Sequence, residues 1–128
     1  MWEVKIMKES CIEKKVYQLH SELCKTLSHP KRLEILNLLR DGEKSAGELV
    51  SLTDSSKANL SQHLAVLRQR RIVSTRREGV NIFYRMANPK MIKACDIIRE
   101  VLFEQLVEDD QMRQVMESSR ARTNNHPV

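Results

Sequence analysis

Residues 55–86 read SSKANLSQHLAVLRQRRIVSTRREGVNIFYRM, and the spacing of the apolar side chains changes within this stretch. In its first half three leucines recur at the spacing that puts side chains on one side of a helix, namely Leu60, Leu64 and Leu67. In its second half apolar and polar residues alternate on both sides of an EG dipeptide, as in a two-stranded hairpin. The stretch therefore predicts a helix over residues 56–71, then a hairpin over residues 73–86 with a basic, glycine-containing tip.

The face of this helix away from the leucines carries short or neutral polar side chains. On a helical wheel the outward positions are Ala58, Asn59, Gln62, Ala65 and Gln69, with Lys57, Ser61 and His63 on the flanks. A helix that faces only water more often carries paired Glu and Lys. Short side chains and neutral hydrogen-bonding groups instead suit a helix that enters the major groove of DNA and reads base edges. The alternative is an ordinary solvated helix beside a basic loop.

The basic charge of the chain is local. The formal net charge is +5 and the isoelectric point is about 9.3, values that nucleic-acid-binding proteins share with many other small proteins. Five arginines lie within residues 68–77, whereas residues 104–110, EQLVEDD, are acidic. The predicted helix contains no acidic residue, so none of its side chains would repel phosphate. The arginines at its far end and in the hairpin are placed to hold the DNA backbone on either side.

The totals limit the class of protein. At 128 residues and 41% hydrophobic, the chain suits one compact domain. No apolar run approaches the roughly 18 residues of a membrane span, and the N-terminus lacks the apolar core of a secretion signal. Three cysteines without CxxC spacing do not suggest a disulfide scaffold. We therefore expect a cytoplasmic protein that does not contact membranes.

The rest of the sequence predicts four more helices. A first helix follows from the apolar spacing between Ile12 and Leu27, and a second begins at SHP (28–30), where proline suits the first helical turn. A short third helix over residues 45–53 is separated from the quoted helix by the turn DSS (54–56), which also offers an N-cap for that helix. A fifth helix follows NP (88–89).

These elements form a mainly α fold with a small β-hairpin, a winged helix-turn-helix. The predicted division is an N-terminal segment at 1–14, a DNA-binding and dimerisation domain at 15–108, and a frayed or disordered C-terminal extension at 109–128, where the apolar pattern thins out.

Four segments in this order resemble the ArsR/SmtB family of homodimeric winged-helix repressors: LSHPKRLEILNLL, GELVSL, LSQHLAVLRQRRIV and TRREGVNIFYRM. The resemblance covers roughly residues 15 to 105. It implies a helix-turn-helix made of residues 46–53 and 56–71, with the second segment as recognition helix and residues 73–86 as the wing. It also implies that the first and fifth helices pair two protomers. Two-fold symmetry then predicts an imperfect palindromic operator, with half-sites about one DNA turn apart or a multiple of that.

The predicted DNA contacts come from the recognition helix and the wing. They are Ser56, Lys57, Ala58, Asn59, Ser61, Gln62, His63, Arg68, Arg76 and Arg77. For His63 the alternative is packing beside the hairpin. One departure concerns the reading turn, where relatives often have SQSAL and this chain has SKANL. Because Lys57 and Asn59 then replace Gln and a small residue, the operator of a relative does not carry over.

Two metal sites familiar in the family are not predicted here. At the start of the third helix the sequence reads Ser45, Ala46 and Gly47, none of which is a soft ligand. The fifth helix contains no histidine, so four zinc ligands do not assemble from it in the family's pattern. No metal or required cofactor is therefore predicted. His20 and Cys24 share a helix face, but two ligands do not make a site.

The cysteines supply the sensing hypothesis. Cys11, Cys24 and Cys95 all lie on the two elements that would pair protomers, so a metalloid, sulfane sulfur or an oxidant acting on them would alter the spacing of the recognition helices. Within one helix Cys11 and Cys24 lie about 20 Å apart, so they do not pair with each other there. Alternatively, Cys95 is simply a small buried hydrophobic residue. Thiol-sensing relatives carry a cysteine in the second helix, where this chain has Asn37.

The sequence argues against two other classes of protein and leaves a third open. An enzyme would need a nucleophile and base, or a metal, gathered in a pocket, whereas four scattered histidines and three glycines suggest no catalytic residues. An RNA-binding protein would show more stacking aromatics than 4%. A constitutive winged-helix regulator without an inducer remains the open alternative.

Overall fold

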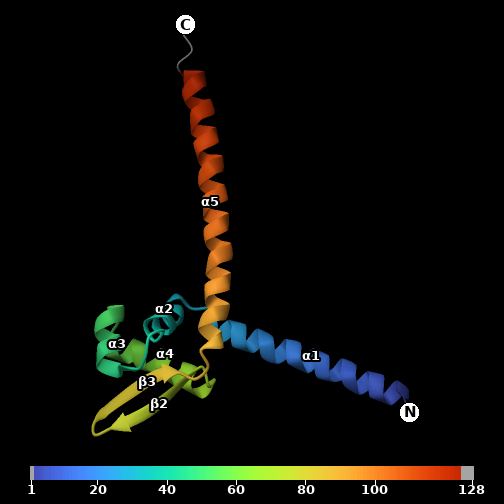
Figure 1. The fold of residues 1–128 in the computed structure, drawn as a ribbon, viewed down its shortest axis with the longest axis vertical. Helices are drawn as coiled ribbons and strands as arrows, with labels where there is room; N and C mark the ends of the chain where they lie inside the picture. Colours follow the sequence, from blue (N-terminus) through green and yellow to red (C-terminus); the bar gives the residue numbers. More distant parts are fainter. Residues whose placement is uncertain (1, 125–128) are drawn as a thin grey trace. The chain divides into compact units, whose positions relative to one another are not determined.

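The computed structural model describes residues 2–124, which form two compact units divided between Pro89 and Lys90 (Figure 1). The first unit contains α1 (Trp2–Leu27), α2 (Pro30–Leu38), β1 (Lys44–Ser45), α3 (Ala46–Thr53), α4 (Lys57–Gln69), β2 (Val73–Glu78) and β3 (Asn81–Met86). The second unit contains α5 (Lys90–Asn124). The order of elements confirms a winged helix-turn-helix, and the predicted domain of residues 15–108 spans parts of both units.

The core of the first unit lies where α2, α3 and α4 meet the base of the wing. Its buried apolar side chains are Ile35, Leu36, Leu39, Leu49, Leu60, Leu64, Leu67, Ile72 and Val73. The three leucines that predicted the recognition helix are among them, each at most 2% exposed. Full burial of one such side chain contributes about 1.5–3 kcal/mol, so this leucine stripe fixes which face of α4 points outward.

Local capping explains where α2, α3 and α4 begin. Pro30 occupies the first turn of α2, and Nδ1 of His29 accepts a hydrogen bond from the Lys31 amide at 3.2 Å. Ser45 caps α3 by accepting from the Glu48 amide at 3.1 Å. The cap predicted from the DSS turn is Ser56, which accepts from the Asn59 amide at 3.2 Å at the start of α4. Each cap satisfies an amide that has no partner within its helix.

The wing belongs to a three-stranded sheet and not to a hairpin alone. The strand order is β1-β3-β2, with both pairs antiparallel. The predicted hairpin is present, with Thr75 opposite Tyr84 and with Gly79 at the tip in a left-handed conformation (φ 62°). The prediction missed β1, because two residues are too few to show an alternating pattern.

Both terminal helices are longer than the sequence suggested. α1 begins at Trp2, within the segment assigned to residues 1–14, and includes Cys11. α5 continues to Asn124, whereas residues beyond 109 were expected to fray; residues 125–128 lie outside the described part. Ion pairs one helical turn apart support the extension: Arg113 lies 2.6 Å from Asp110 and 3.7 Å from Glu117. Within residues 2–124, no helix has both the length and the hydrophobicity that crossing a membrane requires.

Candidate nucleic-acid interface

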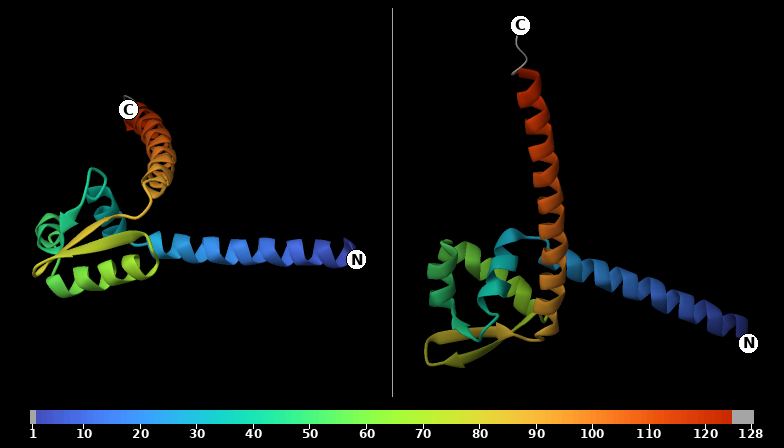
Figure 2. Two further views of the ribbon diagram at one scale, coloured as in Figure 1. Left: turned by 60° about the horizontal axis from the view of Figure 1, so that its bottom comes forward. Right: turned by 45° about the horizontal axis from the view of Figure 1, so that its top comes forward.

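The outer face of α4 is exposed, as the sequence predicted. Its side chains there are Lys57, Ala58, Asn59, Ser61 and Gln62. The helix runs alongside the β2–β3 hairpin, as the left view of Figure 2 shows. Because the leucine stripe holds the opposite face in the core, this surface combines a fixed orientation with free hydrogen-bonding groups. That combination is what reading base edges in a major groove requires.

The connection between α3 and α4 is a tight turn. Asp54 closes α3 in a left-handed conformation (φ 50°, ψ 41°), and Ser56 starts α4 two residues later. An Asp tolerates this conformation better than most side chains do. The turn therefore sets the angle between the two helices, and the Ser56 hydroxyl is occupied by the Asn59 amide at the start of α4.

His63, another predicted DNA contact, is half-buried, unlike the five side chains of the exposed face. Its ring centroid lies 4.3 Å from that of His29, and its Nδ1 accepts a hydrogen bond from Nε of Arg32 at 3.2 Å. Desolvation lowers the pKa of His63 below its ordinary value of 6.5, and the neighbouring His29, Arg32 and Lys31 lower this pKa further. His63 therefore packs against the start of α2.

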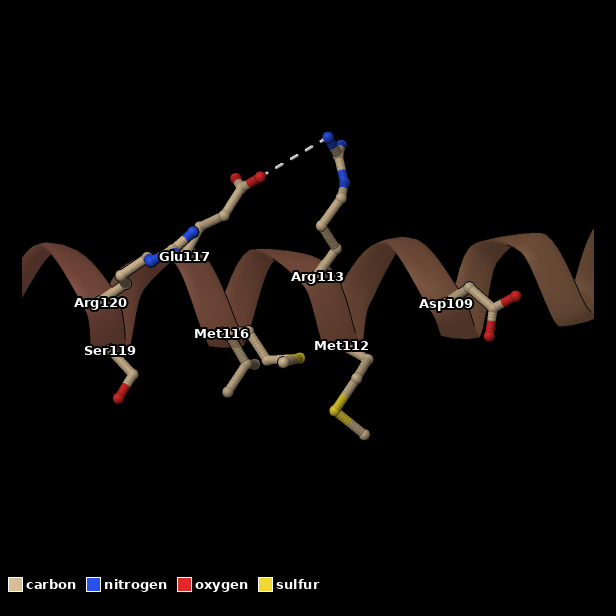
Figure 3. Close-up of a pocket in the computed structure, with 8 residues that line it drawn as sticks. Asp109, Met112, Arg113, Met116, Glu117, Ser119 and Arg120 are labelled. Atoms are coloured by element: carbon tan, nitrogen blue, oxygen red, sulfur yellow. Dashed lines mark ion pairs between the residues drawn. The ribbon is translucent and has the colours of Figure 1, made fainter.

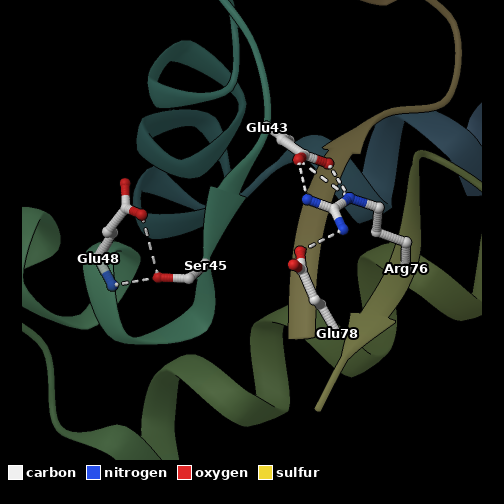
Figure 4. Close-up of polar contacts among 5 residues, drawn as sticks. All are labelled: Glu43, Ser45, Glu48, Arg76 and Glu78. Atoms are coloured by element: carbon white, nitrogen blue, oxygen red, sulfur yellow. Dashed lines mark hydrogen bonds and ion pairs between the residues drawn. The ribbon is translucent and has the colours of Figure 1, made fainter. Parts of the chain in front are cut away.

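Arg76, one of the predicted DNA contacts, is held by two carboxylates (Figure 4). Its Nε lies 3.0 and 2.9 Å from the two oxygens of Glu43, and Nη1 lies 2.8 Å from Oε2 of Glu78. The guanidinium also stacks 4.4 Å above the Phe83 ring centroid. The hydrogen bond to Glu43 raises the pKa of Arg76 and lowers that of Glu43. The cluster joins the loop before β1 to the wing and neutralises this arginine.

Arg77 lies on the opposite face of the wing, because successive strand residues alternate. Its side chain is exposed, and within residues 2–124 it has no ion-pair partner. Arg68 is likewise exposed in the last turn of α4. All three predicted arginine contacts are thus exposed, and Arg76 differs from Arg68 and Arg77 in its ion pairs with Glu43 and Glu78.

The end of α4 turns sharply into the wing. The Ile72 amide donates to the Leu67 carbonyl at 2.9 Å, and the Arg71 amide donates to the Arg68 carbonyl at 3.0 Å. This pair of bonds is the Schellman motif, which usually has glycine at the left-handed position. Here that position is Arg71, with φ 60°. A third arginine is thereby presented on the exposed surface between α4 and β2.

The predicted sensing cysteines lie on α1 and α5. Cys11 and Cys24 are exposed on α1, and Cys95 is half-buried on α5. Within the described residues, none of the three forms a disulfide. In the described part of the chain, no three His, Cys, Asp or Glu side chains are grouped so that they could hold a metal ion. His20 and Cys24 thus remain a pair without further ligands.

The sequence did not predict Glu43 as the partner of Arg76, or His29 as the partner of His63. Glu43 is 33 residues from Arg76, and His29 lies in a different helix-start segment from His63. Neither spacing carries a local signal, because both contacts depend on how the elements pack.

Residues 29–75 match the family model described as bacterial regulatory protein, arsR family. Among curated proteins, the HTH-type transcriptional regulator Rv0081 of Mycobacterium tuberculosis is 41% identical over 88 residues, which cover 68% of this chain and 77% of the relative. The biofilm growth-associated repressor of Agrobacterium fabrum is 46% identical over 76 residues, covering 59% of this chain and 65% of the relative.

Solved structures agree with these matches. The crystal structure of M. tuberculosis Rv0081 superposes with a TM-score of 0.68 at 39% identity, over 73% of this chain and 95% of the other. Reduced HlyU from Vibrio cholerae gives 0.63 at 34% identity, over 70% and 94%. The homodimeric winged helix-turn-helix domain of Mb0332 from Mycobacterium bovis gives 0.66 at 26% identity, over 73% and 87%.

Proposed function

Because the chain belongs to the arsR family of bacterial regulatory proteins, we propose that it is a homodimeric repressor that binds a palindromic DNA operator. The observation that carries the proposal is the exposed, neutral polar face of α4, held outward by a buried leucine stripe. No enzyme family matched the chain, and its relatives are transcriptional regulators.

In the proposed complex α4 lies in the major groove. Asn59 and Gln62 hydrogen-bond to base edges, and Ala58 allows a close approach. Arg68 and Arg77 contact phosphates on either side of the helix, which positions the reading residues without specifying sequence. Lys57 adds a positive charge at the first turn of the helix.

The proposed dimer pairs the first and fifth helices of two protomers. Both helices expose large apolar side chains that a single chain leaves in water: Ile12, Val16 and Leu19 on α1, and Ile98, Val101 and Leu102 on α5. Exposed apolar surface of this kind marks an interaction site. The homodimeric description of the Mb0332 domain supports the same state here. A two-fold dimer then selects two half-sites about one DNA turn apart, or a multiple of it.

The proposed inducer is a species that reacts with thiols: a metalloid, sulfane sulfur or an oxidant. Its targets are Cys11 and Cys24, which are exposed, and Cys95, which is half-buried. Because these residues lie on the helices of the proposed dimer, a modification there would change the separation of the two recognition helices and release DNA. The solved relative HlyU is described in a reduced form, which is consistent with redox chemistry in such a regulator.

The test is fluorescence anisotropy of the reduced protein on a duplex from its own upstream region, with a random duplex beside it. Selective binding that is lost on addition of arsenite, sulfane sulfur or a disulfide-forming oxidant is expected. Asn59→Ala and Gln62→Ala should each weaken specific binding by about 1–3 kcal/mol and leave random-duplex binding unchanged. Equal binding to both duplexes would contradict repression from that region.

Selective binding that no thiol reagent relieves would favour the alternative, a constitutive winged-helix regulator. Replacement of each cysteine by alanine identifies which thiol the reagent modifies. Only a variant that lacks the reactive thiol should stay bound to DNA in the presence of the reagent. Cys95→Ala that left every response intact would remove Cys95 from the sensing hypothesis.

A further inference from the structure

The distal half of α5 carries an exposed apolar patch. We define the distal patch as Met112, Val115 and Met116, which are 62%, 66% and 64% exposed. Figure 3 shows Met112 and Met116 on one side of the helix, away from the ion pair of Arg113 and Glu117. Every residue from 97 to 121 is exposed.

Such a helix needs a partner. Isolated helices are marginally stable in water, and most helical stability in proteins comes from packing of an apolar face. The exposed ion pairs of Arg113 add little, because solvent screens them. Three large apolar side chains within two turns are therefore best explained by a surface that is covered in the assembled protein.

The charges around the distal patch indicate what covers it. Glu108 and Asp109 lie about one turn before the patch, and Arg120 lies about one turn after it. Asp109 and Arg120 are about three helical turns apart and therefore lie on the same edge of the patch. An antiparallel pair of identical helices places Asp109 of one copy beside Arg120 of the other, twice. A parallel pair places like charges together.

We propose that the distal patch is a self-association surface, and that its occupant is the same patch of a second copy in antiparallel orientation. This goes beyond the proposed repressor function, in which α1 and the Ile98, Val101 and Leu102 face of α5 pair two protomers. The distal contact then joins two dimers, so that the assembled protein presents two pairs of recognition helices. Two-fold symmetry makes the contact self-complementary: where a residue of one copy contacts a second residue of the other copy, the same contact occurs with the two copies exchanged.

An antiparallel pairing along the whole of α5 is a less favourable arrangement. It would align Ile98 with Met116 and Leu102 with Met112, and its centre would fall near residue 107. The acidic run of residues 104–110 would then face itself across the axis. Like charges directly opposite one another are destabilising, whereas pairing through the distal patch alone places Asp109 of one copy beside Arg120 of the other.

The mass of the full-length protein tests the proposal. In sedimentation equilibrium over one concentration series, the unmodified chain is expected at twice the mass of the Met112→Glu/Met116→Glu variant. A matched control, Gln111→Glu/Ser118→Glu, adds the same charge to exposed positions on another face of α5 and should keep the full mass. Circular dichroism shows whether each variant keeps its helix. Equal masses for the unmodified chain and the methionine variant would overturn the proposal and leave the patch to a different protein.

A charge exchange tests the orientation. Asp109→Arg and Arg120→Asp should each halve the mass, because each brings like charges together, and the double variant should restore it. A double variant that stays at half mass would overturn the antiparallel arrangement. The mass ratio does not depend on DNA, so a failure of the proposed repressor function would appear separately, as absent selectivity of the unmodified chain between the two duplexes.

Discussion

Nε of Arg76 lies 3.0 and 2.9 Å from the two carboxylate oxygens of Glu43, a residue 33 positions earlier in the chain. This pairing ties the wing to the loop before β1, and it decides which wing arginine is available to phosphate. Arg77 points from the other face of the same strand and is exposed. Adjacent arginines of one wing are thus expected to differ in function.

Salt dependence separates the two arginines. Each phosphate contact contributes about 0.9 to the slope of log K against log salt concentration. Arg77→Ala should therefore reduce this slope by about 0.9 per protomer, whereas Arg76→Ala should leave it nearly unchanged. Anisotropy titrations at several salt concentrations measure both slopes. A loss of slope in Arg76→Ala as large as that in Arg77→Ala would contradict the distinction.

Glu43→Gln should have the opposite effect. The change removes the carboxylate that holds Arg76, so this arginine becomes available to phosphate and the salt slope steepens, by up to about 0.9 per protomer. Glu13→Gln is the matched control, because it removes the same charge from an exposed position on α1. Binding of the random duplex should also strengthen, since a phosphate contact carries no sequence information. An unchanged slope in Glu43→Gln would show that Glu43 does not restrain Arg76.

The contact of His63 with His29 and Arg32 makes the stability of the first unit depend on pH. The folded pKa of His63 lies below its ordinary value of 6.5, so the unfolded chain binds the proton more readily. The stability that depends on neutral His63 is present above pH 6.5 and is lost as the pH falls below that value through the folded pKa.

His63→Gln should reduce this pH dependence, because the amide oxygen still accepts from Arg32 but does not titrate in this range. The measurement is the difference in melting temperature between about pH 7.5 and pH 5, which should be smaller in the variant than in the unmodified chain. His20→Gln, at an exposed position on α1, is the control and should keep the full difference. Equal differences for the unmodified chain and His63→Gln would mean that another group carries the pH response.

The capping hydroxyl of Ser56 should be needed for stability. Ser56→Ala removes the acceptor for the Asn59 amide and should lower the free energy of unfolding by about 1 kcal/mol. Ser61→Ala, at an exposed position inside the same helix, should change it much less, because alanine favours helices. Urea denaturation measures both. Equal losses in the two variants would contradict the capping role.

The parts of the fold that follow local rules were predictable from the sequence. The leucine stripe of α4, the Ser56 cap and the hairpin about Gly79 each depend on residues within one or two turns of one another, and all three are present. The exposed positions of α4 follow directly from the stripe: Lys57, Ala58, Asn59, Ser61 and Gln62.

Contacts between distant segments were not predictable. Nothing in the spacing of His63 or Arg76 indicates that one meets His29 and the other meets Glu43. The long α5 was missed for a different reason. Its apolar face is interrupted by the acidic run at residues 104–110 and resumes with the distal patch. A short stretch of sequence after residue 109 therefore shows only that apolar residues become sparse, and not that the helix continues.

Arg71 occupies a backbone position that glycine would adopt with less strain, at φ 60° in the Schellman motif that ends α4. For a side chain other than glycine, this conformation costs about 1–2 kcal/mol. Selection for thermostability alone would therefore favour Arg71→Gly, and the same change would remove a positive charge between the recognition helix and the wing. In a laboratory evolution experiment, variants selected for resistance to heat should acquire Arg71→Gly and bind DNA more weakly. Variants selected for repression should keep Arg71 and its strained backbone conformation.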